Sequence, residues 1–294
     1  MKKHMNWLAG AIQLTLIAGL TTGACKAADL NARDFFSAPV GTTLGVFYMP
    51  MTRNSEYHGA ADSTGKANLQ VNAFAWRQLL FTDVCGTLCT PQFIVPLVDI
   101  DARLPGASRN SRESGIGDPQ IGGTLFLVNE PATRTYTGLL SLITLPVGEY
   151  HSHNPDVSPG ANRWAGHFIL NHTQGVGDRW VLEANLEAQV YGKNDNYFGS
   201  DLEQAPLFRL QAFASYDFSQ KTYGALRLIH ADGGELRING QRIDNTHKRV
   251  TQVGFEVGHW LDRQNQALVA FTQDVDSDNS YHGSQTLLRL VHVF

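Results

Sequence analysis

The chain has 294 residues, of which 43% are hydrophobic and 17% charged, and its formal net charge at pH 7 is −4. Its basic residues form no cluster, which argues against a nucleic-acid partner, and beyond the N-terminal segment no apolar run approaches the roughly 20 residues of a transmembrane helix. A β-barrel crosses a membrane with alternating apolar and polar residues, so only the periodicity of the sequence can reveal one.

The first segment has the features of a secretory signal peptide. A basic stretch at residues 2–4 precedes an apolar run at residues 7–18, which is too short to cross a bilayer. Small residues at Cys25 and Ala27 predict cleavage after Ala27. The alternative is a lipoprotein signal, cut before Cys25 and acylated on its sulfur, although Thr22 stands where Leu is usual.

Strand-like segments make up the rest of the chain, with hardly a helical pattern among them. Each is about ten residues long, the length that a tilted strand needs to cross a bilayer. Pro96 interrupts the third and predicts a bend or an early exit from the membrane there. Roughly twelve such strands are expected, at residues 43–51, 68–81, 92–102, 118–128, 135–145, 164–173, 180–191, 207–218, 222–230, 249–260, 267–274 and 286–294.

Apolar and polar side chains alternate along these segments. From Trp180 to Val190 the even positions are apolar, whereas the odd positions from Glu183 to Gln189 are polar. A two-sheet sandwich would show the same alternation with its apolar face turned into a core. Alternation alone therefore leaves both folds open.

Connection lengths favour the barrel. Long polar connections, such as residues 52–67, take turns with short ones, such as residues 129–134. Bacterial barrels have short periplasmic turns and long external loops, so this orientation puts both termini in the periplasm. We expect the last strand, ending at Phe294, to close the barrel against the first and to be recognised by the barrel-assembly machinery.

The sequence therefore predicts an all-β protein of the bacterial outer membrane. Residues 1–27 would be the signal peptide, and residues 28–294 a single transmembrane, antiparallel up-and-down β-barrel of about twelve strands. Membrane lipid and lipopolysaccharide would surround it. An aromatic girdle is expected at the periplasmic rim, formed by Tyr136, Trp180, Phe218 and Phe294.

Two cysteines remain after the signal peptide. Cys85 and Cys89 are candidates for a disulfide, which the oxidising periplasm allows, and the alternative is a pair of free thiols. Two thiols without a nearby histidine are an incomplete ligand set for a metal. No metal or cofactor is expected.

Two stretches resemble a known family. They are Gly-Ile-Gly-Asp-Pro at residues 115–119, and Leu-Pro-Val-Gly-Glu-Tyr at residues 145–150 leading to Pro-Gly-Ala-Asn-Arg-Trp at residues 159–164. The family is that of the outer-membrane β-barrel proteins labelled for the meta-pathway of phenol degradation. This resemblance implies a transporter-like barrel that passes small organic, including aromatic, solutes, and it brings no catalytic residues. The family-motif residues are Gly117, Asp118, Pro119, Pro146, Gly148, Asn162, Arg163 and Trp164.

Within that motif, two residues have an expected place at the membrane surface. Trp164 would join an outer aromatic girdle, and Arg163 would meet a lipopolysaccharide phosphate.

Polar side chains on the inward faces are expected to line the lumen. Twelve strands lie between small barrels filled by side chains and wide porins, so two interpretations follow. The favoured one is a narrow channel for passive passage of small organic solutes, and the other is a plugged, ion-paired structural barrel without transport. The predicted lumen-lining residues are Glu183, Asn185, Glu187, Gln189, Arg209, Gln211, Arg227, Glu256, Asp274 and Arg289.

An outer-membrane lipid hydrolase is the rival class. Such enzymes are also twelve-stranded and use Ser, His and Asn on the outer surface of the barrel. His172 stands at an outward position, but no serine with a polar orienting group accompanies it, so we expect no enzyme.

Overall fold

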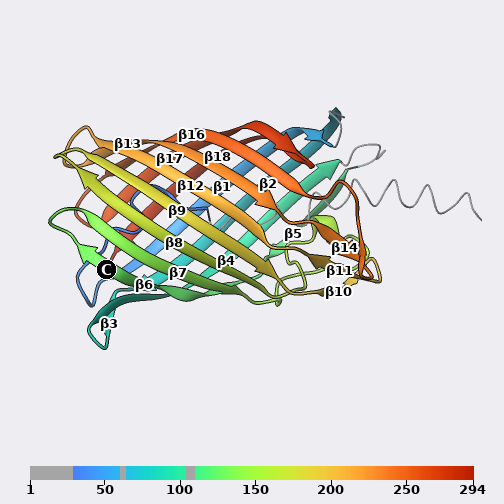
Figure 1. The fold of residues 1–294 in the computed structure, drawn as a ribbon, viewed down its shortest axis with the longest axis horizontal. Coiled ribbons are helices and arrows are strands. Elements are labelled where there is room, and N and C mark those ends of the chain that lie inside the picture. The colour runs from blue at the N-terminus through green and yellow to red at the C-terminus, as the bar shows by residue number, and fades with distance from the viewer. Residues whose placement is uncertain (1–28, 60–63, 104–109) are drawn as a thin grey trace, which may run out of the picture.

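The computed structural model describes residues 29–59, 64–103 and 110–294. Over these residues the chain is an antiparallel β-barrel with one short 3-10 helix, η1 (Pro155–Val157) (Figure 1). The predicted signal peptide, including Cys25, lies outside the described residues. No described helix is long and apolar enough to cross a membrane.

Twelve long strands form the wall among the described residues. The ring closes where β1 pairs with β18, with Phe47 opposite Leu290, and where β2 pairs with both β1 and β4. A closed ring rules out the sandwich and confirms the predicted antiparallel barrel. The wall strands are β1 (Thr43–His58), β2 (Thr64–Leu80), β4 (Thr87–Arg103), β6 (Gln120–Glu130), β7 (Thr135–Thr144), β8 (Ala165–Val176), β9 (Trp180–Tyr191), β12 (Leu207–Asp217), β13 (Thr222–Gly233), β16 (Lys248–Trp260), β17 (Asn265–Asp278) and β18 (Ser280–Val293).

Pro96 lies where β4 changes partner. The first half of β4 pairs with β6 up to Ile94, and its second half pairs with β5 (Ser111–Ile116) from Leu97 onward. Because proline has no N–H to donate, it is tolerated in this gap between the two ladders. β4 itself continues to Arg103, as its predicted extent to residue 102 implies, and the interruption falls in its partner.

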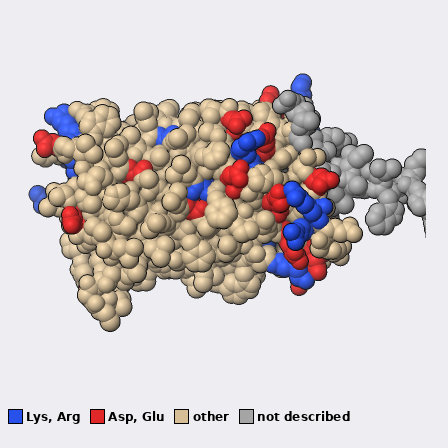
Figure 2. Space-filling model, in the orientation of Figure 1, with Lys and Arg blue, Asp and Glu red and all other residues tan. Residues whose placement is uncertain are grey.

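The outside of the barrel is apolar across its middle. Along β9 the exposed side chains include Leu182 and Leu186, while Glu183 and Glu187 between them are buried. Charged side chains gather toward the two ends in Figure 2, and the surface between them is almost uncharged. An apolar band of this extent is stable against lipid and would be a liability in water.

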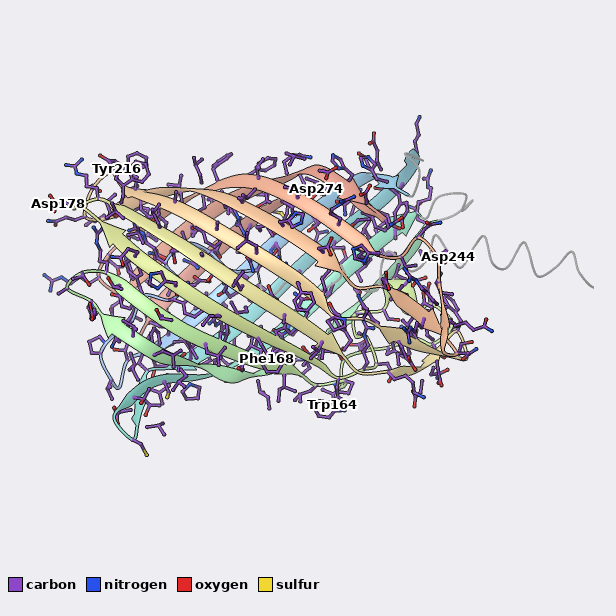
Figure 3. The ribbon with its side chains drawn as sticks, in the orientation of Figure 1. Trp164, Phe168, Asp178, Tyr216, Asp244 and Asp274 are labelled. Carbon is purple, nitrogen blue, oxygen red and sulfur yellow. The ribbon has the colours of Figure 1, made fainter. Side chains whose placement is uncertain are left out.

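Aromatic residues mark the end of the barrel where the turns are short and where the chain reaches Phe294 (Figure 1). Trp180, Phe218 and Phe294 are exposed there, and Tyr216, which contacts the first two, lies at the same end (Figure 3). Tyr136 is only 3% exposed. The prediction for Tyr136 is wrong because the outward positions of β7 are odd-numbered.

Both described cysteines are free thiols. β3 (Thr82–Val84) and the start of β4 form a hairpin, and Cys85 stands in its turn with a φ of 52°. The residue opposite Cys89 is Thr82, so strand pairing does not bring the two thiols face to face. The predicted disulfide is therefore absent from the structure.

A small second sheet stands at the end with the long loops (Figure 1). It consists of four short strands from the connections that follow β9 and β13. Both connections are expected as loops from the sequence, because strands of two to five residues leave little periodicity to recognise. They are β10 (Asn194–Tyr197), β11 (Ser200–Gln204), β14 (Leu236–Ile238) and β15 (Gln241–Arg242).

Candidate functional site

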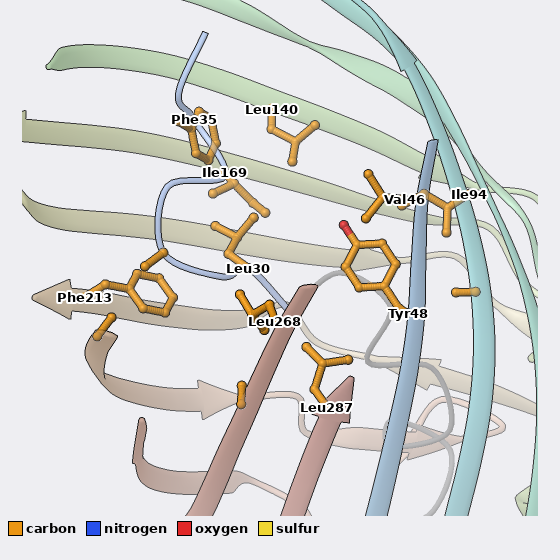
Figure 4. Close-up of a cluster of buried hydrophobic side chains, with 14 of the residues drawn as sticks. Leu30, Phe35, Val46, Tyr48, Ile94, Leu140, Ile169, Phe213, Leu268 and Leu287 are labelled. Carbon is orange, nitrogen blue, oxygen red and sulfur yellow. The ribbon is translucent and has the colours of Figure 1, made fainter. Parts of the chain in front are cut away.

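Residues 29–38, named here the inner segment, run inside the barrel. Leu30, Ala32 and Phe35 are at most 3% exposed and pack on inward apolar side chains of the wall (Figure 4). Gly138 of β7 leaves room for them, since a Cβ at this position would lie 2.8 Å from the Phe35 ring. No described residue of the inner segment belongs to a strand. Side-chain contacts, and not β pairing, therefore hold it in the lumen.

Glu256 of β16 binds the beginning of the inner segment. Its carboxylate accepts hydrogen bonds from Asn31 Nδ2 at 3.1 Å and from the backbone N–H of Ala32 at 2.9 Å. Arg227 of β13 lies 3.7 Å from the same carboxylate and donates to the carbonyl oxygen of Leu30 at 3.1 Å. These donors offset the burial of a carboxylate that is 1% exposed.

Glu183 of β9 binds the middle of the inner segment. Both of its carboxylate oxygens accept the backbone N–H of Arg33, at 2.8 and 3.1 Å. The φ of Arg33 is 71°, in the left-handed region, so the segment turns sharply at this residue. Its guanidinium reaches Asp217 at 2.6 Å and Ser215 at 3.1 Å, both on β12.

Two further arginines of the wall bind acidic residues of the inner segment. Arg289 of β18 donates to Asp34 at 2.5 Å. Arg209 of β12 pairs with Asp29 and, at 3.0 Å, with Glu187. The wall and the segment thus carry complementary charges at both ends of the contact.

The other predicted lumen residues also point inward. Asn185 donates to the carbonyl oxygen of Gln211, and the Gln211 amide donates to Glu187 at 3.0 Å. The Gln189 amide donates to Glu187 at 2.6 Å. Asp274 lies toward the end with the long loops, where it accepts hydrogen bonds from the Gln252 amide and the backbone N–H of Gly283. Of the ten predicted residues, Gln189 and Arg209 are half-buried and the others are buried.

The sequence pattern does not predict the inner segment itself. The expected alternative to an open channel is an ion-paired plug made of wall side chains, whereas the structure pairs the wall with a separate stretch of chain. A signal was present: Leu30, Phe35 and Phe36 are apolar residues outside any strand pattern, interspersed with Asp29, Arg33 and Asp34.

At the end with the long loops, the family motif folds a loop against the wall. Asp118 accepts the backbone N–H of Gly148 at 2.8 Å and that of Ala161 at 2.7 Å. A Cβ at Gly148 would lie 2.6 Å from the carbonyl carbon of Gly117, so these two residues can approach only without a side chain. Pro119 accepts the N–H of Leu145, just before Pro146, and this bond fixes the start of the loop.

The last three motif residues end that loop. Trp164 is 56% exposed and points outward from the wall, as Figure 3 shows. Asn162 has a φ of 51° and donates its side-chain amide to Asn194. Arg163 is 4% exposed and donates to Gln204 at 2.6 Å. The expectation that Arg163 meets a lipopolysaccharide phosphate is wrong, since its side chain is buried against the small sheet.

Asp156 of η1 is buried beneath the small sheet. Its carboxyl oxygen accepts a hydrogen bond from the hydroxyl of Tyr197, in β10, at 2.6 Å. Burial raises the pKa of Asp156 to about 7, although the hydrogen bond from Tyr197 favours the charged form. The long loops at this end are therefore joined by a group whose pKa is near neutral.

His172 lies on the outer surface of β8. Its Nδ1 is 3.0 Å from the hydroxyl of Thr137, on the neighbouring strand β7. Among the described residues, no serine or carboxylate side chain is hydrogen-bonded to this ring, so the geometry supplies no activated nucleophile.

Comparisons with known proteins agree on one fold. The family model described as "Putative MetA-pathway of phenol degradation" matches residues 51–290, whereas a comparison with curated proteins found no match. Among solved structures, an outer membrane channel from Pseudomonas putida F1 superposes with a TM-score of 0.84 at 23% identity, covering 90% of this chain and 100% of its own.

Two autotransporter domains are more distant matches. The β domain of BrkA from Bordetella gives a TM-score of 0.54 at 8% identity, covering 86% of this chain and 100% of its own. The translocator domain of NalP from Neisseria meningitidis gives 0.53 at 10% identity, covering 98% of this chain and 96% of its own. At these identities the matches establish the barrel fold alone.

Proposed function

The chain belongs to the family described as "Putative MetA-pathway of phenol degradation", and from this premise we propose that it is an outer-membrane channel for passive passage of small organic, including aromatic, solutes. The inner segment is the gate of this channel. The solved protein from Pseudomonas putida F1 with the same fold is described as an outer membrane channel, which supports the assignment.

The observation that carries the proposal is the way in which the inner segment is held in the lumen. The wall forms a closed ring of paired strands, so it stays intact when the lumen empties. The inner segment, in contrast, is attached through side chains such as Glu183, Glu256 and Arg289. Breaking these contacts opens a path without disturbing any strand ladder. A barrel with a purely structural role would be equally stable with its lumen filled by the side chains of the wall, so it would not need a separate inner segment.

The proposed orientation follows from the ends of the barrel. The short turns, Phe294 and the last residues of the inner segment lie at one end, which we assign to the periplasm. The small sheet and the loop that contains η1 then face the outside, among lipopolysaccharide. Residues 1–27 are the proposed signal peptide, and the strand that ends at Phe294 is the proposed recognition element for barrel assembly.

Uptake by whole cells tests the proposed function. A strain that lacks this protein should accumulate a labelled monoaromatic solute more slowly than the parent strain when the external concentration is low. Expression of the intact chain in the deletion strain should restore the rate. Expression of an unrelated outer-membrane barrel should not. Equal uptake by all strains, with the barrel present in their outer membranes, would contradict the proposal and favour a structural role.

A further inference from the structure

A cavity of about 340 Å³ lies at the inner end of the lumen, between the inner segment and the wall. Most of its surface is apolar, and its lining comes mainly from the inner segment, β1, β2, β6 and β18, with the Asp34–Arg289 ion pair among the lining residues. Its principal apolar side chains are Phe36, Leu44, Val46, Leu79, Phe81 and Phe126. A cavity of roughly 150 Å³ already holds a benzene ring, so this one has room for a ring with a substituent.

Arg77 of β2 lies in the wall of this cavity. It stands opposite Val46 on β1 and Ile94 on β4, on the inward face of the strand. Its Nε donates to Gln92 at 2.5 Å, and its Nη1 donates to the hydroxyl of Tyr48 at 3.2 Å. Both partners are neutral, and both fix the direction of the guanidinium.

Arg77 differs from the other arginines of the lumen wall in its charge balance. Arg209, Arg227 and Arg289 each lie within 4.0 Å of a carboxylate oxygen. Among the described residues, no carboxylate oxygen lies within that distance of Arg77, and its Nη2 makes no hydrogen bond. A guanidinium without a counter-ion beside apolar walls is unfavourable, and a bound carboxylate would offset that cost.

From this combination we propose that the cavity binds a small aromatic carboxylate. The carboxylate accepts hydrogen bonds from Nη2 of Arg77, and the ring packs against Leu79, Phe81 and Phe126. An inorganic anion would leave those apolar walls unfilled, and a neutral ring would leave Nη2 without a partner. The inference rests on the proposed function, of which it names the solute class and an inner binding site.

Calorimetric titration of the intact purified barrel in detergent tests the site directly. The two probes are benzoate and benzyl alcohol, which share a ring but differ in charge. We expect saturable binding of benzoate, and weaker binding of benzyl alcohol by about tenfold or more, because a hydrogen bond to a charged group carries that much affinity. Arg77→Gln should weaken benzoate by a similar factor and leave benzyl alcohol unchanged.

Two further variants make the test specific. Arg77→Lys retains the charge and should keep part of the preference for benzoate. Arg53→Gln is the matched control, because Arg53 is an exposed wall arginine whose guanidinium bonds only to a backbone carbonyl and does not line the cavity. It should bind both probes as the unmodified protein does. A shift in gel mobility on boiling verifies that each variant is a folded barrel.

Three outcomes would overturn the proposed site: equal affinity for the two probes, unchanged benzoate binding by Arg77→Gln, or no saturable binding by the folded protein. Conductance measured on the same preparations separates this site from the channel function. Conductance without benzoate binding would refute the proposed site and support the channel function. Benzoate binding to a barrel that never conducts would support the site and refute the channel function.

Discussion

The backbone N–H of Arg33 points at the carboxylate of Glu183 and donates to both of its oxygens, at 2.8 and 3.1 Å. A residue of the inner segment is thus bound by its main chain to a strand of the wall. This contact depends on the left-handed turn at Arg33, with a φ of 71°, which directs the N–H toward β9. Such a contact can be released without unfolding the barrel.

Removal of the Glu183 carboxylate should loosen the inner segment. In Glu183→Ala the N–H of Arg33 loses its acceptor, and a buried donor without a partner costs about 1–3 kcal/mol, so the open fraction should rise by roughly fivefold or more. Single-channel recordings measure that fraction. Glu203→Ala is the control, because Glu203 is exposed in the small sheet and should leave gating unchanged. An open fraction equal to that of the control would contradict the role of Glu183.

A side chain at Gly148 should displace the outer loop. The Cβ of Gly148→Ala would lie 2.6 Å from the carbonyl carbon of Gly117, and relief of such a clash costs about 1–3 kcal/mol. Limited proteolysis should cut residues 145–163 faster in this variant. In the control, Gly192→Ala, the nearest atom is 3.3 Å away, and the cutting rate should stay near that of the unmodified protein. Equal rates in the two variants would refute the close approach.

The outer loops should be more stable in acid than in alkali. The pKa of Asp156 is about 7 in the folded protein, whereas a free carboxyl titrates near 3.9, so the open loop releases its proton first as the pH rises. The stabilisation is complete below about pH 4 and is lost as the pH rises to about 7, by up to roughly 4 kcal/mol. Hydrogen exchange of residues 150–158 at pH 5 and pH 8, corrected for intrinsic rates, measures the change.

Two variants assign that pH dependence to Asp156. Asp156→Asn should remove it, because the amide does not titrate in this range. Tyr197→Phe should move the midpoint to higher pH, because the hydrogen bond from Tyr197 lowers the pKa of Asp156. If Asp156→Asn keeps the full pH dependence, another group is responsible.

A charge on the apolar belt should destabilise the barrel in lipid. Leu226 is 69% exposed on β13, and Leu226→Arg should cost about 2–4 kcal/mol if it faces the middle of the bilayer. Val147 is 70% exposed but lies in an outer loop, so Val147→Arg should be nearly neutral. Denaturant unfolding from lipid vesicles compares the two. Equal stability of both variants would place Leu226 outside the lipid.

Much of the wall was predictable because its signal is local. The alternation along β9 assigns Leu182 and Glu183 to opposite faces without reference to any other part of the chain. The alternation of long and short connections predicts that consecutive strands run up and down around the barrel. The prediction for Tyr136 is wrong for a simple reason: a tyrosine can stand on either face of a strand, so its residue type does not decide its direction. Tyr136 is an odd number of residues from the outward-facing Leu139 and therefore points inward. Parity, more than residue type, decides which face a side chain takes.

The contents of the lumen depend on contacts that no local pattern carries. Arg33 and Glu183 are 150 positions apart, and Asn31 and Glu256 are 225 apart. The sequence around each of these residues does not indicate which distant residue it will contact. Arg163 was misplaced for the same reason, because Gln204, which binds it, comes from a connection that shows no strand pattern in the sequence.

Planar-bilayer recording of the intact chain beside a variant that lacks residues 29–38 tests the gate most directly. The closed ring of strands does not include these residues, so the variant should still fold, which its mobility shift on boiling would verify. The account predicts brief, small openings for the intact chain and a larger, steady conductance for the variant. A folded variant whose conductance equals that of the intact chain would contradict it.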